Sequence, residues 1–310
     1  MGRTRPLKYG SFWERWARGV RWTWVNEQYR GHLPEGFDAT VMTLHSADRL
    51  CVKQGRSTAR VIFHPVEPPG SAPSEASTRP LSVYLKRYYR LPWPLRVAAM
   101  LDPARGYSPA AAEWAHLERA RTLGVDVPEV VAAGEQIGPH AGFRSFLMVA
   151  ELTGCEALHE AVPKLAERLD PRELAALKRR VISEMARITA TLHAARQFHK
   201  DLYLCHFFLD LDRLEQEGAP IRLVLIDLHR LGAHRLWPDW GRWKDLGQLL
   251  FSTYGIEGID DRDRRRFWHQ YRRLLPVPFA RWQERLVRFR AARYERHNRW
   301  ARDEGPEASP

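Results

Sequence analysis

The sequence is poor in cysteine and has no long apolar run. Its three cysteines, Cys51, Cys155 and Cys205, lie far apart in the 310 residues and form no C-x-x-C pair. Such a sparse, odd number argues against a disulfide framework and favours a reducing compartment. Charged residues interrupt the apolar ones before Arg30, and there is no stretch of 18 apolar residues. We therefore expect no secretory signal and no membrane-spanning helix, and a cytoplasmic location.

Acidic residues are fewer than basic ones. Lys and Arg together number 49 against 37 Asp and Glu, which gives a formal net charge of +12. This excess favours an anionic partner, such as nucleotide phosphates, nucleic acid or an acidic membrane surface. The sequence has no recognised nucleic-acid reader motif, so we expect no nucleic-acid partner. It does not indicate an oligomeric state.

Tryptophan and arginine alternate in residues 1–36, at Trp13, Trp16, Trp22 and Trp24. Tryptophan beside arginine suits the headgroup zone of a bilayer. Amphipathic patterns more often mark a helix packed on the main domain. We interpret residues 1–36 as an N-terminal extension of this second kind. Peripheral contact with the cytoplasmic face of the inner membrane stays open.

Residues 37–150 and 151–302 have different patterns. The first range predicts a small, mainly antiparallel β lobe, with a flexible proline- and serine-rich loop over residues 65–80. The second predicts a larger, mainly helical lobe, followed by a tail at 303–310. The expected fold class is therefore α+β with two lobes. Strands are predicted within 39–63 (two strands) and over 81–86, 130–133, 146–149, 207–211 and 221–226, and helices over 108–122, 246–254, 264–275 and 279–302.

The clearest helix follows Asp170. Asp170 suits the N-cap, Pro171 the first turn, and Glu173 completes a capping box. Apolar residues then recur at three- and four-residue spacing as far as Leu192, which predicts one buried face. This helix leads directly to Asp201.

Five polar residues occur in the order that phosphoryl transfer from ATP requires. Lys86 ends a strand, and Glu113 lies on the next helix, where it could pair with Lys86. Asp201 follows the long helix, Asp227 ends a buried strand, and Asp245 occurs where a kinase aspartate braces the catalytic loop. This chemistry needs a lysine at the phosphates, carboxylates at Mg²⁺ and a carboxylate for the hydroxyl proton. Each residue alone has an ordinary explanation as a surface charge, turn or cap.

Several segments resemble the lipopolysaccharide core kinases of the Kdo/WaaP family, within the protein-kinase-like superfamily. The resemblance runs from about Val41 to Tyr254, and two central motifs are specific to it. The matching segments are HKDLYLCHFFL at 199–209, VLIDLHR at 224–230, RWKDL at 242–246, KQGRST at 53–58, Glu113-Trp114 and LGV at 123–125.

This resemblance implies a bilobed, protein-kinase-like fold and an ATP-dependent kinase. Its acceptor would be a heptose or Kdo hydroxyl in the lipopolysaccharide inner core, carried on a lipid-linked core oligosaccharide. Asp201 would be the catalytic base and Asp227 a ligand of Mg²⁺. Lys86 would contact the ATP phosphates, with Glu113 as its partner.

The resemblance also implies a nucleotide site. Glu151 and Leu152 fall where a hinge meets adenine through its backbone. His206 falls at a second metal position, although Mg²⁺ prefers oxygen ligands and a structural histidine is an equal alternative. The segment at 53–58 has one glycine, so its backbone would cradle phosphates only in part. The residues implied there are Lys53, Gly55, Arg56, Ser57 and Thr58.

Other functions remain open from the sequence. The acceptor could be a protein Ser, Thr or Tyr or another small molecule, or the chain could be a kinase-fold regulatory module without turnover. Residues 231–242 are short for an activation loop and there is no Ala-Pro-Glu, which disfavours a protein acceptor. The retained Lys86, Asp201 and Asp227 disfavour a module without turnover.

Overall fold

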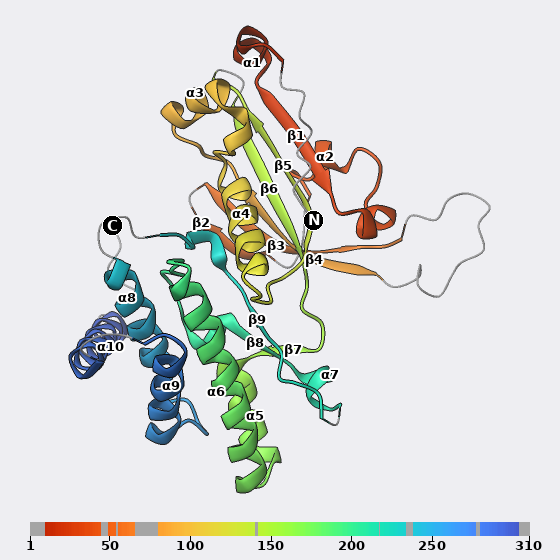
Figure 1. Ribbon diagram of the computed structural model, residues 1–310. Helices are drawn as coiled ribbons and strands as arrows, with labels where there is room; N and C mark the ends of the chain where they lie inside the picture. Colours follow the sequence, from red (N-terminus) through yellow and green to blue (C-terminus); the bar gives the residue numbers. More distant parts are fainter. Residues whose placement is uncertain are drawn as a thin grey trace. The chain divides into compact units, whose positions relative to one another are not determined.

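A computed structural model describes residues 10–44, 49–53, 55–65, 80–139, 142–216, 218–233, 238–276 and 280–303 (Figure 1). The chain divides into two units. The sheet unit comprises Met1–Glu118 and Pro128–Leu152, and the helical unit comprises Arg119–Val127 and Thr153–Pro310. The expected loop at 65–80 lies almost entirely outside the described residues.

An antiparallel sheet of six strands forms the centre of the sheet unit. The order is β1-β5-β6-β4-β3-β2, and every neighbouring pair is antiparallel. The predicted hairpin and the three later strands are present, most of them longer than predicted. The bounds are β1 Val20–Val25, β2 Arg49–Lys53, β3 Arg56–Phe63, β4 Leu81–Tyr88, β5 Val130–Ile137 and β6 Phe143–Ala150.

Short helices accompany this sheet. The predicted helix over 108–122 is α4, Pro109–Thr122. The others are α1 Phe12–Arg18, η1 Glu27–His32, α2 Phe37–Thr40, α3 Trp93–Leu101 and η3 Pro103–Arg105. On one face of the sheet, residues from η1 to α2 (Leu33 and Phe37) belong to the same core cluster as Leu85, Phe146 and Met148.

The N-terminal tryptophan segment is not only a packed helix, as its pattern had suggested. It supplies the edge strand β1, which pairs with β5 from Val20 to Val25. Trp22 and Trp24 are two residues apart, so they share one face of a strand. Both pack against Trp114 of α4 with tilted rings, whose centroids are 5.8 and 4.6 Å from that of Trp114. The alternation of faces every two residues, as in a strand, therefore explains this part of the segment better than the spacing of residues on a helix does.

The helical unit combines a small sheet with long helices. The strands β7 Cys155–Ala157, β8 Phe207–Asp210 and β9 Leu223–Leu225 form an antiparallel sheet in that order. Helix α6 packs with α9, and α8 with α10. The helices are α5 Leu158–Arg168, α6 Pro171–Ala194, η4 Leu204–His206, α7 Leu211–Leu214, η5 Leu228–Arg230, α8 Pro238–Phe251, α9 Asp261–Leu274 and α10 Ala280–Asp303.

The predicted start of the long helix is confirmed. The Asp170 carboxylate accepts hydrogen bonds from the backbone N–H groups of Arg172 and Glu173, at 2.7 and 2.9 Å. The Glu173 carboxylate accepts in turn from the backbone N–H of Asp170 at 3.2 Å. These bonds satisfy donors that a helix N-terminus leaves unpaired, so α6 begins at a defined residue. The α+β fold class expected from the sequence is confirmed.

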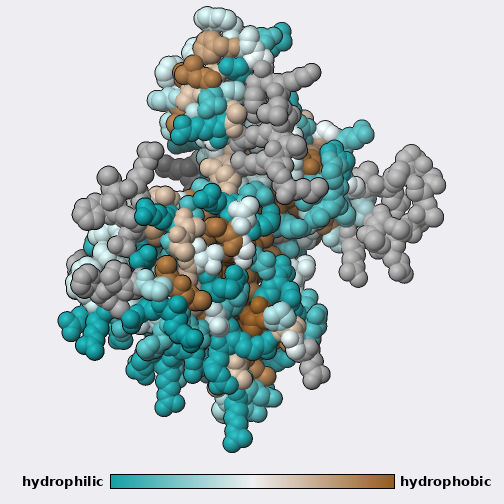
Figure 2. Space-filling view, in the orientation of Figure 1, coloured by the Kyte–Doolittle hydropathy of each residue, from teal (hydrophilic) through white to brown (hydrophobic). Residues whose placement is uncertain are grey.

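Hydrophilic side chains cover much of the visible face over α5, α6 and α9, in the lower part of Figure 2. Hydrophobic side chains reach the surface at the top of the same view, over α1 and α3. The large exposed apolar side chains there are Trp13, Trp93, Leu95 and Leu101. None of the helices in the described ranges is both long and apolar enough to cross a membrane.

Candidate active site

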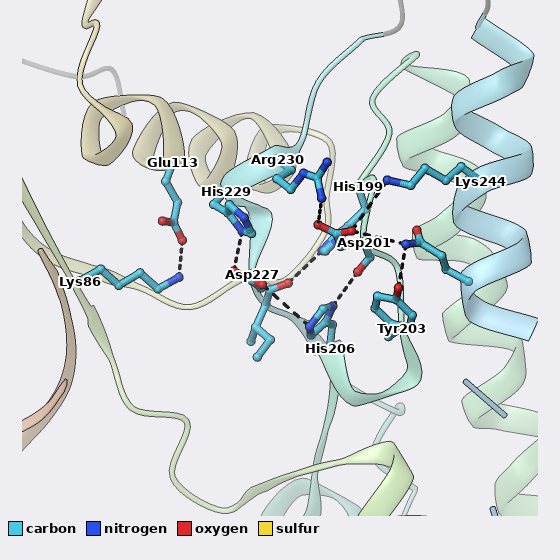
Figure 3. A network of polar contacts seen from close by, with 12 residues as sticks. Lys86, Glu113, His199, Asp201, Tyr203, His206, Asp227, His229, Arg230 and Lys244 are labelled. Carbon is cyan, nitrogen blue, oxygen red and sulfur yellow. Dashed lines mark hydrogen bonds and ion pairs between the residues drawn. The ribbon is translucent and has the colours of Figure 1, made fainter. Parts of the chain in front are cut away.

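Lys86 and Glu113 form an ion pair within the sheet unit. Lys86 Nζ lies 2.5 Å from Glu113 Oε1 (Figure 3). Glu113 Oε2 accepts a hydrogen bond of 2.8 Å from the hydroxyl of Tyr88, two residues along β4. The Glu113 side chain is 2% exposed. The expected pair is therefore present, and both oxygens of its carboxylate are engaged.

Local packing positions Glu113. Ser108 is buried just before α4, and its hydroxyl accepts a bond of 3.1 Å from the Ala111 N–H. The next residue after Glu113 is Trp114, which packs against Trp22 and Trp24. Sequence reasoning did not connect this tryptophan cluster with the site. The spacing of Trp22 and Trp24 was the signal that could have done so.

The segment expected to bind phosphate lies on the β2–β3 hairpin. Gly55 has φ of +80°, and an added Cβ would come 2.9 Å from Arg90 Cδ. Glycine is therefore required at this turn. Thr58 pairs with Lys86 across the strands, and Arg56 pairs with Tyr88, so both share the Lys86 face of the sheet. The side chain of Lys53 lies outside the described part of the chain.

Ser57 does not fit the expected phosphate role. It lies on the opposite face of β3 from Thr58, because side chains alternate along a strand. Its hydroxyl is buried and lies 3.2 Å from both Arg87 Nε and the Tyr89 hydroxyl. Arg87 is itself only 1% exposed, and its Nη1 donates a hydrogen bond of 2.7 Å to the Leu44 carbonyl. Both residues therefore tie β3 and β4 to the segment beneath the sheet.

Glu151 and Leu152 end the sheet unit. The Glu151 N–H donates to the Ser82 carbonyl at 2.9 Å, so this group already has a partner. The Glu151 carboxylate accepts two bonds of 2.8 Å from Arg60. The Arg60 guanidinium lowers the pKa of this carboxyl, against the raising effect of burial. The side chain of Glu151 therefore has a structural partner within the unit.

Asp201 lies on a loop that Asp245 holds from within the helical unit. Asp245 is fully buried, and its carboxylate accepts bonds of 2.7 Å from the backbone N–H groups of His199 and Lys200. It also accepts from His193 Nε2 at 3.3 Å. Lys200 has φ of +70°, a left-handed conformation that a lysine rarely adopts. The bracing role expected for Asp245 agrees with these bonds.

His206 lies between Asp201 and Asp227. Its Nδ1 is 2.7 Å from the backbone carbonyl of Asp201, which can only accept, so Nδ1 carries the proton. Its Nε2 is 3.9 Å from Asp227 Oδ2. The other oxygen, Asp227 Oδ1, lies 2.8 Å from His229 Nδ1. The ring of His206 stacks on His199, whose own pKa is lowered by burial.

The donors near Asp227 are compatible with a magnesium ion. Asp227 follows β9 with φ of +61°, and its carboxylate is 32% exposed. His206 Nε2 faces this carboxylate at 3.9 Å. Mg²⁺ in nucleotide sites is commonly held by one or two carboxylates together with phosphate oxygens. Within the described ranges, no group of three or more His, Cys, Asp and Glu side chains is arranged so that it could hold a metal ion by itself.

Three further side chains contact the Asp201 carboxylate, and the sequence did not predict these contacts. Arg230 Nη1 lies 2.7 Å from Oδ2, and Lys244 Nζ lies 3.8 Å from Oδ1 (Figure 3). Gln248 Nε2 donates to Oδ1 at 3.4 Å and to the Tyr203 hydroxyl at 2.9 Å. Burial lowers the pKa of Lys244. The nearby Arg230 lowers this pKa further, whereas Asp201 raises it.

Comparison with known proteins identifies the class and then the family. The fold is protein-kinase-like, similar to a solved structure described as "WaaP in complex with acyl carrier protein". The TM-score is 0.58 and the identity 26%, over 87% of this chain and 99% of that one. The model of the lipopolysaccharide kinase (Kdo/WaaP) family matches residues 74–271. The chain therefore belongs to this family.

Curated relatives are lipopolysaccharide core heptose(I) kinases named WaaP. The Pseudomonas aeruginosa protein is 35% identical over 162 residues, which is 52% of this chain and 59% of that relative. An Escherichia coli protein is 34% identical over 159 residues, or 51% of this chain and 58% of that relative. The matched part thus spans less than two thirds of each relative.

Proposed function

We propose that this protein is an ATP-dependent kinase that phosphorylates a sugar hydroxyl of the lipopolysaccharide inner core, with heptose as the acceptor. The observation that carries this proposal is the position of His206. Its ring lies against the backbone of Asp201 on one side and the carboxylate of Asp227 on the other. Phosphoryl transfer requires one carboxylate that binds the metal ion and another that accepts the proton of the acceptor hydroxyl. Family membership and the names of the relatives support the same acceptor class.

In this proposal Asp201 accepts the proton of the acceptor hydroxyl. The Asp245 carboxylate accepts hydrogen bonds from the backbone of the loop that carries Asp201. These bonds fix the direction of the Asp201 side chain. Lys86 binds the ATP phosphates, and Glu113 orients the ammonium group of Lys86. The hairpin residues Arg56 and Thr58 assist from the same face of the sheet, whereas Ser57 is assigned no contact.

Asp227 would hold Mg²⁺, with His206 beside it as a second donor. When bound, the ion neutralises negative charge on the phosphates that are being separated. His229 orients the Asp227 carboxylate through Oδ1. Because the Glu151 N–H is engaged with Ser82, we assign the hinge contacts with adenine to the Glu151 carbonyl and the Leu152 N–H.

The test is transfer of labelled phosphate from ATP to a dephosphorylated lipopolysaccharide core. Wild type is compared with Asp201→Asn and Asp227→Asn. Loss of a general base costs about 10²- to 10⁴-fold in rate, so Asp201→Asn should lose most of its turnover while still binding ATP. Asp261→Asn, on the exposed start of α9, is the matched control. Full transfer by Asp201→Asn would refute the assigned base, and transfer to casein but not to glycan would refute the acceptor.

We also propose peripheral contact with an anionic membrane surface, through the apolar patch on α1 and α3. The exposed fractions of Trp13, Trp93 and Leu101 are 74%, 57% and 66%. Arg15 joins the two helices through a bond of 2.7 Å from Nε to the Met100 carbonyl. Tryptophan with neighbouring arginine suits the headgroup zone. Flotation with anionic vesicles should recover wild type, and recover less of Trp13→Ser with Leu101→Ser.

A second partner is an acyl carrier protein, as in the similar solved structure. The helical unit contains a cavity of about 170 Å³ lined mainly by leucine and other apolar side chains, including Leu177, Leu246 and Leu249. An apolar cavity of this kind suits an acyl chain. Native mass spectrometry should detect a complex with acylated carrier protein. Leu249→Trp, which fills the cavity, should weaken it, and equal binding of the unacylated carrier would contradict the acyl contact.

A further inference from the structure

The Asp201 carboxylate faces two basic side chains. Arg230 contacts one oxygen of its carboxylate at 2.7 Å, and Lys244 lies 3.8 Å from the other. Figure 3 shows both side chains directed at this carboxylate from different elements, η5 and α8. The second cation calls for an explanation.

The nearby carboxylate of Asp245 offsets only part of the extra charge. It is fully buried and already accepts two backbone N–H groups and His193. Lys200 adds a third positive charge close to Lys244. Three cations thus lie near two carboxylates, and one of these carboxylates has its hydrogen-bonding capacity committed to the loop.

Proton transfer from the acceptor hydroxyl to Asp201 makes this imbalance larger, because it neutralises the carboxylate. This argument rests on the proposed function, in which the acceptor hydroxyl takes up a position on Asp201. Oδ2 now holds Arg230, so the hydroxyl must displace this guanidinium or share the oxygen with it. The Arg230 side chain is 51% exposed, and water can solvate it once displaced. Lys244 is only 22% exposed, so loss of its counter-charge is more costly.

We propose that Arg230 and Lys244 form an acceptor subsite for an anionic group, a carboxylate or phosphate, that lies beside the hydroxyl to be phosphorylated. Such a group restores the charge balance that protonation of Asp201 disturbs. The guanidinium of Arg230 binds the anion through two N–H groups, and the ammonium of Lys244 adds a compact positive charge. A neutral sugar provides neither contact, so the subsite selects acidic glycans. Gln248 is the positioning residue that holds Asp201 and Tyr203 beside it.

The experiment compares three forms of the core acceptor. All three leave the acceptor hydroxyl free: one keeps its other anionic groups (the intact form), one has its carboxyl groups reduced to alcohols, and one has its remaining phosphates removed. Wild type should prefer the intact form over one of the modified forms by about 10- to 100-fold in kcat/KM. The form that loses activity identifies the anion. In Arg230→Gln and Lys244→Gln this preference should fall toward parity, whereas Arg179→Gln, on the exposed face of α6, should keep it.

Acceptor binding without ATP is measured by calorimetry on the same proteins, so that the subsite is tested independently of turnover. Weaker binding of the intact form by both variants supports it, even where no acceptor is phosphorylated and the proposed function fails. Equal wild-type preference for all three forms overturns it. So does a variant that loses the same factor on every form or mainly raises KM for ATP, because that result places the residue at the nucleotide.

Discussion

Asp245 Oδ1 accepts a 2.7 Å hydrogen bond from the backbone N–H of Lys200, a lysine held at φ of +70°. Asp245 Oδ2 accepts a second bond of the same length from His199. A non-glycine residue in the left-handed region costs free energy, and it persists only where its surroundings fix it. The buried carboxylate of α8 thus holds the loop in the conformation that presents Asp201. The loop and α8 are 45 residues apart in the chain, so tertiary structure creates this contact.

Asp245→Asn should lower both stability and turnover. An amide has one accepting oxygen, so one of the two backbone N–H groups loses its partner inside the protein. An unsatisfied buried donor costs about 1–3 kcal/mol in the free energy of unfolding. Urea unfolding and phosphate transfer measure the two effects. Unchanged unfolding, with Asp261→Asn as the surface control, would show that the loop does not depend on Asp245.

Glu113→Gln should raise KM for ATP. The amide keeps the size of the side chain and can still bond Tyr88, but the 18%-exposed Lys86 loses its counter-charge. We expect a loss of about 10- to 100-fold in kcat/KM for ATP, the range of a charged hydrogen bond. Steady-state kinetics with ATP varied give this number. Glu27→Gln, which removes an exposed ion pair with Arg30, should leave KM unaltered. A similar loss in both variants would contradict a specific role for the pair.

Asp170→Ala should destabilise α6 without changing the chemistry. The substitution removes the acceptor for two N–H groups at the helix start and should cost about 1 kcal/mol. Thermal and urea unfolding report this cost, and transfer rates well below the unfolding temperature should match wild type. Arg179→Ala, on the exposed side of the same helix, should have a smaller effect on unfolding. A variant as stable as wild type would show that the capping box contributes little.

The thiol of Cys155 should react slowly at neutral pH. Burial raises its pKa to about 11, with Asp210 adding to the effect. Only the thiolate is nucleophilic, so at pH 8 alkylation by iodoacetamide should be roughly 100-fold slower than for an unperturbed thiol. The rate should continue to increase as the pH rises above 9. Mass spectrometry follows the labelling in a Cys51→Ser, Cys205→Ser protein. A plateau in the rate near pH 9 would contradict the raised pKa.

Local patterns in the sequence predicted much of the fold. The capping box at Asp170 and the spacing of apolar residues after it marked α6, because both depend on residues within a few positions of one another. The hairpin that leads to Asp227 was predicted from short apolar runs around a polar turn. The same period-based reasoning treated Trp22 and Trp24 as part of a helical segment. Their partner across the sheet is more than a hundred residues away, so the local pattern did not reveal the strand.

The sequence by itself determined the order of the candidate site residues: Lys86, then Glu113, then Asp201 and Asp227, on or after elements that local patterns predict. Tertiary structure alone decided which side chains these residues contact. It turned Ser57 to the face opposite Thr58 and buried Arg87 beneath the sheet. It also brought Arg230 and Lys244 to Asp201. Charge and hydrogen-bonding capacity are properties of single residues, whereas their pairing depends on packing between elements that are remote in the chain.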